Sequence, residues 1–209
     1  MVGVDLGIVR PVVTSNNHFC GKRRWKELEA RIFRLRRKLQ AKGTKSAKRH
    51  LRKLSGKLLR QRRDYDHLLS RLIVDSTSFG GTIAMGNLTG IRSHVTQKHG
   101  KQSRCLHSWS FAQVSSFVDY KGEEQGQRVV VVDPRYTSQT CNRCGFTSKA
   151  NRQSQGVFFC GQCGYQLNAD LNAARNIRAK YVAQLANIGT SFVGGPLSDS
   201  LSSQATCVA

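Results

Sequence analysis

The sequence has no long apolar run. Its opening stretch, MVGVDLGIVR, lacks the hydrophobic core of a signal peptide, and no later stretch is apolar enough for a membrane-spanning helix. Neither a short membrane-surface helix nor a lipidation signal is evident. These absences predict a soluble protein of the cytoplasm with no membrane partner.

Acidic residues are also scarce. The 209 residues include 12 Asp and Glu against 34 Lys and Arg, which gives a formal net charge of +22. This excess predicts a polyanionic partner, because Lys and Arg contacts to phosphates release counterions and dominate affinity for nucleic acid. DNA or RNA is therefore the expected partner. The length allows one domain of ordinary size plus an appendage.

The basic residues are concentrated in the first third of the chain. Residues 22–63 hold 19 of the 34 basic residues and only two acidic ones. Beneath the charge, apolar residues at helical spacing run from Trp25 to Leu39 and from Leu51 through Leu68 to Leu72, with a break near 42–46. This pattern predicts an antiparallel helical hairpin over 22–75.

The cationic face of this hairpin has two interpretations. It is either an ordinary solvated surface or a contact surface for nucleic acid. Solvated faces usually mix charges of both signs, so the shortage of acidic residues favours the second interpretation. The residues assigned to the contact are Arg36, Arg37, Lys45, Lys48, Arg49, Arg52 and Lys53.

Several stretches have the periodicity of strands. Residues 2–7 alternate apolar side chains with Gly3, Asp5 and Gly7, so Asp5 is expected to point away from the apolar face. RPVVTSN and HFCG predict two more strands of a meander, and GTIAMGNL predicts a buried strand. The continuous run RVVVVD at 128–133 is typical of an interior strand that is covered on both faces.

Two later segments are predicted to be helical. In residues 105–126, Leu106, Trp109, Gln113, Phe117 and Tyr120 share one face. A last amphipathic helix carries Leu171, Ala174, Ile177, Tyr181 and Leu185. Residues 187–209 are rich in Ser and Gly without periodicity, which predicts a disordered tail.

Cysteine is present in an odd number, seven, and four of these residues form two CxxC pairs. Cys141, Cys144, Cys160 and Cys163 have the spacing of a structural zinc site, and four thiolates leave no position for a substrate. The alternative is a set of unliganded or redox-active cysteines. Between the pairs, Phe146, Phe158 and Phe159 either pack the small segment or contact nucleic acid, and packing is favoured.

The predicted order of elements is that of an RNase H-like nuclease core: three strands, helices, a strand, a helix, a strand, the cysteine segment and a last helix. In such cores, carboxylates from the first strand, the fourth strand and a late helix hold two divalent cations. Asp5 matches the first position and Asp170 the last. Taken alone, Asp5 is an ordinary strand residue and Asp170 an ordinary residue near a helix N-terminus.

Particular strings extend this likeness to a family. GVDLG, LHSWSFAQ, YKGEEQG, VDPRYTSQTCNRCG and NADLNAARNI resemble the C-terminal half of TnpB (OrfB), an insertion-sequence protein related to the type V CRISPR effectors. The resemblance covers about residues 1–180. It implies a RuvC-type nuclease domain with an inserted zinc ribbon, guided to DNA by an RNA. It also implies a prokaryotic, nucleoid-associated protein and Mg²⁺ held by an Asp, a Glu and an Asp.

The resemblance sets the expected architecture. We expect an α/β protein with an RNase H-like (RuvC) core at 1–136 and 167–186, a basic helical hairpin insertion at 22–75 and an inserted four-cysteine zinc ribbon at 137–166. Zinc is then a structural cofactor, and Mg²⁺ a weakly held ion at Asp5 and Asp170.

Two departures from the family pattern matter. Gly86 stands where the family has its Glu, and Asn87 stands where Asp is common. The N-terminal half with which the family grips guide RNA and target DNA is also expected to be absent from this chain.

Three functions remain open on these grounds. One is a nucleic-acid-binding protein whose nuclease activity is impaired, since a missing metal ligand costs orders of magnitude in rate. Another is an active RNA-guided DNA endonuclease in which Asp133 or Glu123 replaces the missing Glu. The third is a truncated transposon copy without activity.

Overall fold

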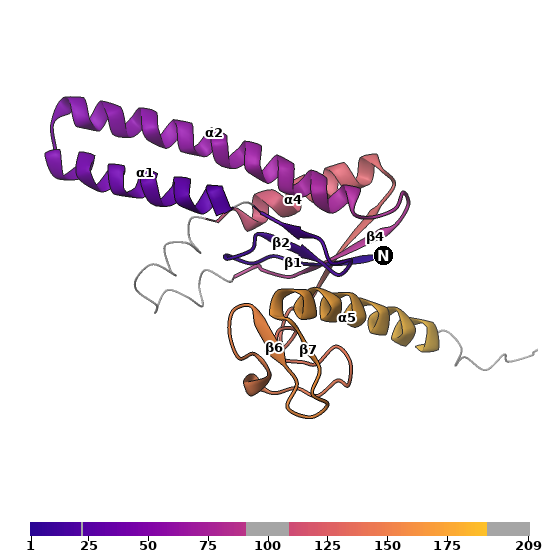
Figure 1. Ribbon diagram of the computed structural model, residues 1–209. Coiled ribbons are helices and arrows are strands. Elements are labelled where there is room, and N and C mark those ends of the chain that lie inside the picture. Colours follow the sequence, from indigo (N-terminus) through magenta and orange to yellow (C-terminus); the bar gives the residue numbers. More distant parts are fainter. Residues whose placement is uncertain (22, 91–108, 192–209) are drawn as a thin grey trace, which may run out of the picture.

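A five-stranded mixed sheet runs through the middle of the protein (Figure 1). The computed structural model describes residues 1–21, 23–90 and 109–191. The strands are β1 (Val2–Asp5), β2 (Val12–Thr14), β3 (Phe19–Cys20), β4 (Thr82–Gly86) and β5 (Arg128–Val132). They lie in the order β3-β2-β1-β4-β5, with β1–β2 and β2–β3 antiparallel and β1–β4 and β4–β5 parallel. The predicted meander of three strands is confirmed.

Helices cover both faces of this sheet (Figure 1). The end of α2 (Lys45–Asp75) and α4 (Phe111–Glu124) lie on one face, and α5 (Ala169–Ser191) lies on the other. The larger apolar cluster joins strand residues such as Val4 and Ile83 to Leu69 of α2 and Val114 of α4. A smaller cluster joins Ala84 and Val132 to Ile177 and Tyr181 of α5. The molecule is therefore a three-layer α/β arrangement.

Gly3 allows α5 to lie directly against β1. A Cβ atom at position 3 would lie 2.3 Å from the carbonyl oxygen of Ala174 and 2.7 Å from the amide nitrogen of Arg178. No side chain fits in that space. The alternation in residues 2–7 thus has a structural reason: the glycine face of the strand, which includes Asp5, meets the backbone of the last helix.

The predicted hairpin consists of α1 (Arg23–Lys42) and α2, joined at Gly43 and Thr44. Thr44 caps α2, because its side-chain oxygen accepts a hydrogen bond from the amide of Ala47 at 3.2 Å. The prediction of which apolar residues pack was wrong at the end of α2. Leu68 and Leu72 are 63% and 47% exposed, whereas their neighbours Leu69 and Ile73 are buried against the sheet.

The predictions for the next helix and for β5 differ from the structure. The helix predicted from residue 105 begins at Phe111, and residues 91–108 lie outside the described part of the chain. Its buried face is Phe111, Val114, Val118 and Gly122, and Tyr120 is 40% exposed. β5 is an edge strand of the described sheet rather than an interior strand, so Val131 is 59% exposed. An apolar run alone does not distinguish these two environments.

The cysteine segment between β5 and α5 carries a small sheet of its own, with β6 (Val157–Phe159) antiparallel to β7 (Gln166–Asn168). The predicted boundary at 166/167 therefore falls inside β7. Phe158 is fully buried, as predicted for packing, while Phe146 and Phe159 are 40% and 38% exposed. α5 extends to Ser191, so residues 187–191 are helical and not part of a disordered tail. Residues 192–209 lie outside the described part of the chain.

None of the helices that the structure describes is both long enough and apolar enough to cross a bilayer.

Candidate functional site

The four cysteines of the CxxC pairs converge on one point. Their Sγ atoms all lie within 4.8 Å of one another. The Sγ atoms of Cys141 and Cys163 are 3.8 Å apart, and those of Cys144 and Cys160 are 3.5 Å apart. A tetrahedral zinc ion with Zn–S bonds of about 2.3 Å requires S···S distances of about 3.8 Å. The cluster therefore has the dimensions of a four-thiolate metal site.

Both CxxC turns have the same local structure. The amide of Cys141 donates to the carbonyl of Phe146 at 2.8 Å, and the amide of Cys160 donates to that of Tyr165 at 2.9 Å. Gly145 and Gly164 close the turns with φ values of 79° and 68°. Only glycine adopts this conformation without strain, which is why each pair is followed by one.

Asparagines hold the cysteine segment against α5. The Nδ2 atom of Asn172 donates to the carbonyl of Thr140 at 2.8 Å, and Asn176 donates to the carbonyls of Thr137 and Thr140, both at 2.7 Å. In return, the amide of Asn142 donates to Oδ1 of Asn172 at 3.1 Å. The side chains of Asn172 and Asn176 are buried, so the contacts join two parts of the chain across an interface that excludes water.

Asn168, rather than Asp170, caps the last helix. Its Oδ1 atom accepts hydrogen bonds from the amides of Asp170 at 3.1 Å and Leu171 at 3.3 Å. Asp170 is buried in the first turn, where the helix dipole favours a negative charge. Its carboxylate is therefore not the cap of this helix.

Asp5 and Asp170 lie within electrostatic reach of one another. Burial, followed by the negative charge of Asp170, raises the pKa of Asp5 to about 7, against a smaller opposing effect of Arg152. Two carboxylates placed together in this way disfavour simultaneous ionisation. A cation between them would relieve the repulsion.

Arg152 supplies such a cation from the cysteine segment. Its Nη2 atom lies 3.4 Å from Oδ1 of Asp170, whose side chain is 7% exposed. Arg152 follows the short helix Lys149–Asn151, and Asn151 ties both CxxC turns together by donating to the carbonyl of Phe146 and accepting from the amide of Gly161. The fold of the cysteine segment thus determines where the guanidinium lies.

Gly86 ends β4 on the α5 side of the sheet. A Cβ atom there would lie 3.2 Å from Cβ of Pro134 and 3.7 Å from Cδ1 of Ile177, a residue of α5. The position contributes no ligand atom to its surroundings. Within the described part of the chain, no third His, Cys, Asp or Glu side chain joins Asp5 and Asp170 in a three-ligand group.

Asp133 and Glu123, the two acidic residues considered as replacements for the missing Glu, lie in different parts of the fold. Asp133 follows β5, and its Oδ1 atom accepts a hydrogen bond from the amide of Arg135 at 3.0 Å, with the side chain 58% exposed. Glu123 is an exposed residue near the end of α4, on the opposite face of the sheet from α5.

The assigned basic residues of the hairpin lie mostly on its surface. Lys45, Lys48, Arg49, Arg52 and Lys53 are exposed, as is Arg37, and Arg36 is half-buried. The hairpin is braced internally by an ion pair between Arg62 and Glu29, with 2.5 Å between Nη2 and Oε1. One of the two acidic residues in this region therefore serves the packing of α1 on α2.

Three contributors to the site were not singled out from sequence. Arg152, Asn151 and Asn168 were not assigned to it. For Asn168, the available signal was the repeat of asparagine at 168, 172 and 176, because residues four apart share one face of a helix.

Comparison with known proteins identifies the class. The family model described as "Cas12f1-like, TNB domain" matches residues 111–177. The "CRISPR-associated endodeoxyribonuclease Cas12f1" of Sulfoacidibacillus thermotolerans is 34% identical over 195 residues, covering 85% of this chain and 44% of that protein. "TnpB-like protein MJ0751" of Methanocaldococcus jannaschii is 32% identical over 148 residues, covering 70% of this chain and 52% of that protein.

A solved structure shows the same fold. The "Cryo-EM structure of the Cas12f1-sgRNA-target DNA complex" superposes with a TM-score of 0.67 at 23% sequence identity, over 85% of this chain and 49% of that one. The protein is thus a Cas12f-like α/β protein with a four-cysteine segment. The sequence matches place the chain in the TnpB family. It spans about half the length, or less, of the curated relatives it matches.

Proposed function

We propose that this chain is a TnpB-like, transposon-associated protein that binds DNA, with guide RNA as a second partner, and whose RuvC-type nuclease domain is catalytically impaired. The core at 1–136 and 167–186 is RNase H-like in this proposal, with the hairpin at 22–75 and the zinc ribbon at 137–166 both inserted. The strand order β3-β2-β1-β4-β5 supports that assignment. The partners are proposed by analogy with the structural neighbour that is solved with an sgRNA and target DNA. Relatives from a bacterium and an archaeon support a prokaryotic location, and DNA as a partner places the protein at the nucleoid in this proposal.

Gly86 is the observation that carries the proposal. It lies at the end of β4 where the resemblance expects Glu, and it leaves Asp5 and Asp170 as two carboxylates instead of three. Mg²⁺ at such a site stabilises the charge on the attacking and leaving oxygens of a phosphodiester. The two remaining carboxylates would hold one ion weakly, with water completing its coordination.

The remaining residues of the site support binding without cleavage. Arg152 partly neutralises Asp170, which reduces the repulsion that a metal ion would otherwise relieve. Asp133 does not favour the alternative of an active RNA-guided endonuclease, because its carboxylate is exposed and hydrogen-bonded to the following turn. A truncated copy without function predicts no nucleic-acid binding beyond nonspecific charge attraction.

The basic hairpin provides the binding surface in this proposal, and its salt dependence tests it. Replacing Arg36, Arg37, Arg49 and Arg52 with Gln should weaken binding to any duplex and lower the slope of log K against log salt by roughly 0.9 per lost phosphate contact. Fluorescence anisotropy across a salt series measures this. The matched control replaces Arg128, Arg135, Arg143 and Lys149, exposed residues outside the hairpin. Equal slopes for the hairpin variant and the wild type would show that the basic residues of the hairpin do not contact the phosphates.

A further inference from the structure

The four cysteines of the cluster differ in their exposure to solvent. Cys141 and Cys160, the first cysteine of each CxxC pair, are 1% and 0% exposed. Cys144 and Cys163, the second cysteine of each pair, are exposed. A small oxidant in solution therefore reaches the cluster through the second cysteine of either pair. Sulfur atoms that combine thiolate character with exposure are the ones that peroxides oxidise.

Each exposed thiol has a buried thiol of the other CxxC turn beside it. The Sγ atom of Cys144 lies 3.5 Å from that of Cys160, and the Sγ atom of Cys163 lies 3.8 Å from that of Cys141. The backbone amide of Cys163 donates to Sγ of Cys160 at 3.5 Å and holds this sulfur in place. A Cys144–Cys160 disulfide requires the two sulfur atoms to approach by about 1.5 Å. The closer pair is therefore the one that an oxidant should join first.

The surroundings of the cluster suit anionic sulfur. Residues 137–166 contain no Asp or Glu and three basic residues, Arg143, Lys149 and Arg152. Arg143 directly precedes Cys144, and its guanidinium carbon lies 5.9 Å from the centre of the Tyr165 ring in the second turn. Zinc is held by thiolates, and the thiolate is also the form that attacks a peroxide. The residues that fit the metal thus also fit this oxidation.

We propose that Cys144 is an oxidation site with Cys160 as its disulfide partner, so that a peroxide replaces the metal by a covalent link between the two turns. The Cys144 thiolate attacks hydrogen peroxide, the O–O bond breaks, and hydroxide leaves and is protonated to water. The sulfenic acid formed on Cys144 is then attacked by the Cys160 thiolate, which displaces a second water. Two electrons pass from sulfur to the peroxide and two protons are taken up. Two thiolates remain, too few to close a tetrahedral zinc site.

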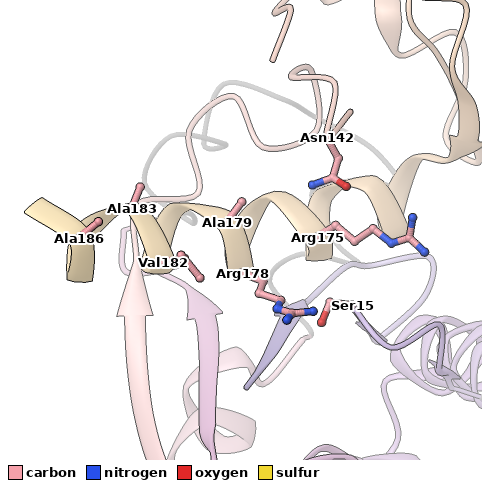
Figure 2. A pocket seen from close by; sticks show the side chains of 8 residues that line it. All are labelled: Ser15, Asn142, Arg175, Arg178, Ala179, Val182, Ala183 and Ala186. Atoms are coloured by element: carbon pink, nitrogen blue, oxygen red, sulfur yellow. The ribbon is translucent and has the colours of Figure 1, made fainter. Parts of the chain in front are cut away.

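The contacts that fix the cysteine segment on α5 do not use cysteine side chains. Asn142 lies inside the first CxxC turn and is directed toward α5 (Figure 2), where its Nδ2 atom donates to Oδ1 of Asn176 at 3.4 Å. Asn151 bonds to the backbone of both turns. The proposed disulfide joins the same two turns. The oxidised segment should therefore keep its fold and hold Arg152 beside Asp170.

Disulfide mapping of peroxide-treated protein tests the proposal. The full chain, loaded with zinc, is treated with about one equivalent of hydrogen peroxide, and the zinc released is measured with a chromogenic chelator. Trypsin cleaves after Arg143, Lys149 and Arg152, so Cys141 and Cys144 fall on separate peptides, and both are separated from Cys160. Tandem mass spectrometry without reductant then identifies the linked pairs and distinguishes Cys160 from Cys163.

A matched variant excludes disulfides from elsewhere in the chain. It carries Ser at the three cysteines outside the cluster, Cys20, Cys105 and Cys207, so every disulfide within one chain arises inside the cluster. Cys144→Ser, which has neither the fourth thiolate nor the proposed disulfide, is the reference for thermal unfolding. All proteins are followed by circular dichroism before and after peroxide.

We expect release of about one zinc per chain, and a Cys144–Cys160 disulfide at least about fivefold more abundant than a disulfide within either CxxC pair. A dithiol reductant with added zinc should reverse both changes. Oxidised wild type should unfold at a higher temperature than Cys144→Ser. Protein that contains no zinc is tested by the same map, because its thiols lie equally close. Disulfides mainly within the CxxC pairs, zinc retained after the peroxide is consumed, or oxidised protein that unfolds like Cys144→Ser would overturn the inference.

Discussion

The guanidinium of Arg152 lies 3.4 Å from the carboxylate of Asp170, although one residue belongs to the cysteine segment and the other to the last helix of the core. This ion pair links the two CxxC turns to the Asp5–Asp170 pair. The position of the arginine depends on Asn151, which joins the turns, and the turns depend on whatever holds the four thiolates together. A metal bound in the cysteine cluster would therefore influence the carboxylates without touching them.

The first prediction concerns that metal. Protein purified without chelator should contain about one zinc per chain by elemental analysis, because the S···S distances fit a tetrahedral ion. Cys144→Ser should release the zinc and destabilise the segment by several kcal/mol, on the order expected when metal binding and local folding are coupled. Thermal unfolding monitored by circular dichroism measures the loss.

Cys20→Ser is the control for this change. Cys20 is a half-buried residue of β3, on the edge of the main sheet and outside the cluster. It should leave the zinc content unchanged. Wild-type protein that contains no zinc would refute the assignment of the cluster.

A second prediction tests the close contact between β1 and α5. Gly3→Ala should destabilise the protein by about 3 kcal/mol, at the upper end of the usual cost of overpacking, because the added methyl group meets backbone atoms of α5. The same substitution at Gly56 should have the opposite sign. There the nearest atom to an added Cβ is Nη1 of Arg60 at 3.7 Å, so the higher helix propensity of Ala should stabilise α2 by about 0.5–1 kcal/mol. Urea unfolding of both variants measures the difference, and a Gly3→Ala protein as stable as the wild type would contradict the packing described.

Periodicity and spacing predicted the elements better than they predicted their surroundings. The alternation at 2–7 predicted β1 and the orientation of Asp5, and the two CxxC pairs predicted a converging cluster. Which face of a helix is buried depends on its neighbours in space, so Leu68 and Leu72 were assigned to the interior although both are exposed. The edge position of β5 depends on sheet order, which a run of valines does not encode.

The residues of the candidate site were likewise predicted only in part. Asp5, Asp170 and Gly86 were found because each stands in a recognisable motif. Arg152 was not assigned to the site, because its contact with Asp170 spans 18 positions and arises only when the cysteine segment folds back on α5. The capping role of Asn168 was missed because a following Asp is an equally good cap by residue type.

A third prediction concerns Asp66, a buried acid of α2 that accepts a hydrogen bond from Ser110, the residue before α4. Burial raises the pKa of Asp66 to about 6, against smaller opposing effects of its hydrogen bond from Ser110 and of the charge on Arg62. A folded-state pKa above the unfolded value contributes stability below about pH 4 that is lost as the pH rises through about 6. The free energy of unfolding that is lost amounts to at most about 3 kcal/mol, at 1.36 kcal/mol per pKa unit.

Asp66→Asn should therefore remove this part of the pH dependence. The variant keeps an oxygen that accepts the hydrogen bond from Ser110, and it should gain stability relative to the wild type between pH 4 and pH 7. Asp64→Asn, an exposed position on the same helix, is the control and should follow the wild-type curve. Urea unfolding at a series of pH values supplies the data, and parallel curves for Asp66→Asn and the wild type would rule out the effect.

The central claim is that this chain binds nucleic acid without cutting it, and a cleavage assay tests it most directly. Labelled single-stranded and duplex DNA are incubated with wild-type protein, Asp170→Ala and Gly86→Glu in Mg²⁺ or Mn²⁺, at concentrations where anisotropy shows binding. The account predicts intact DNA with the wild type and with Asp170→Ala. It predicts cleavage with Gly86→Glu, which needs Pro134 to shift by a few tenths of an ångström. Robust cleavage by the wild type that Asp170→Ala abolishes would contradict the account.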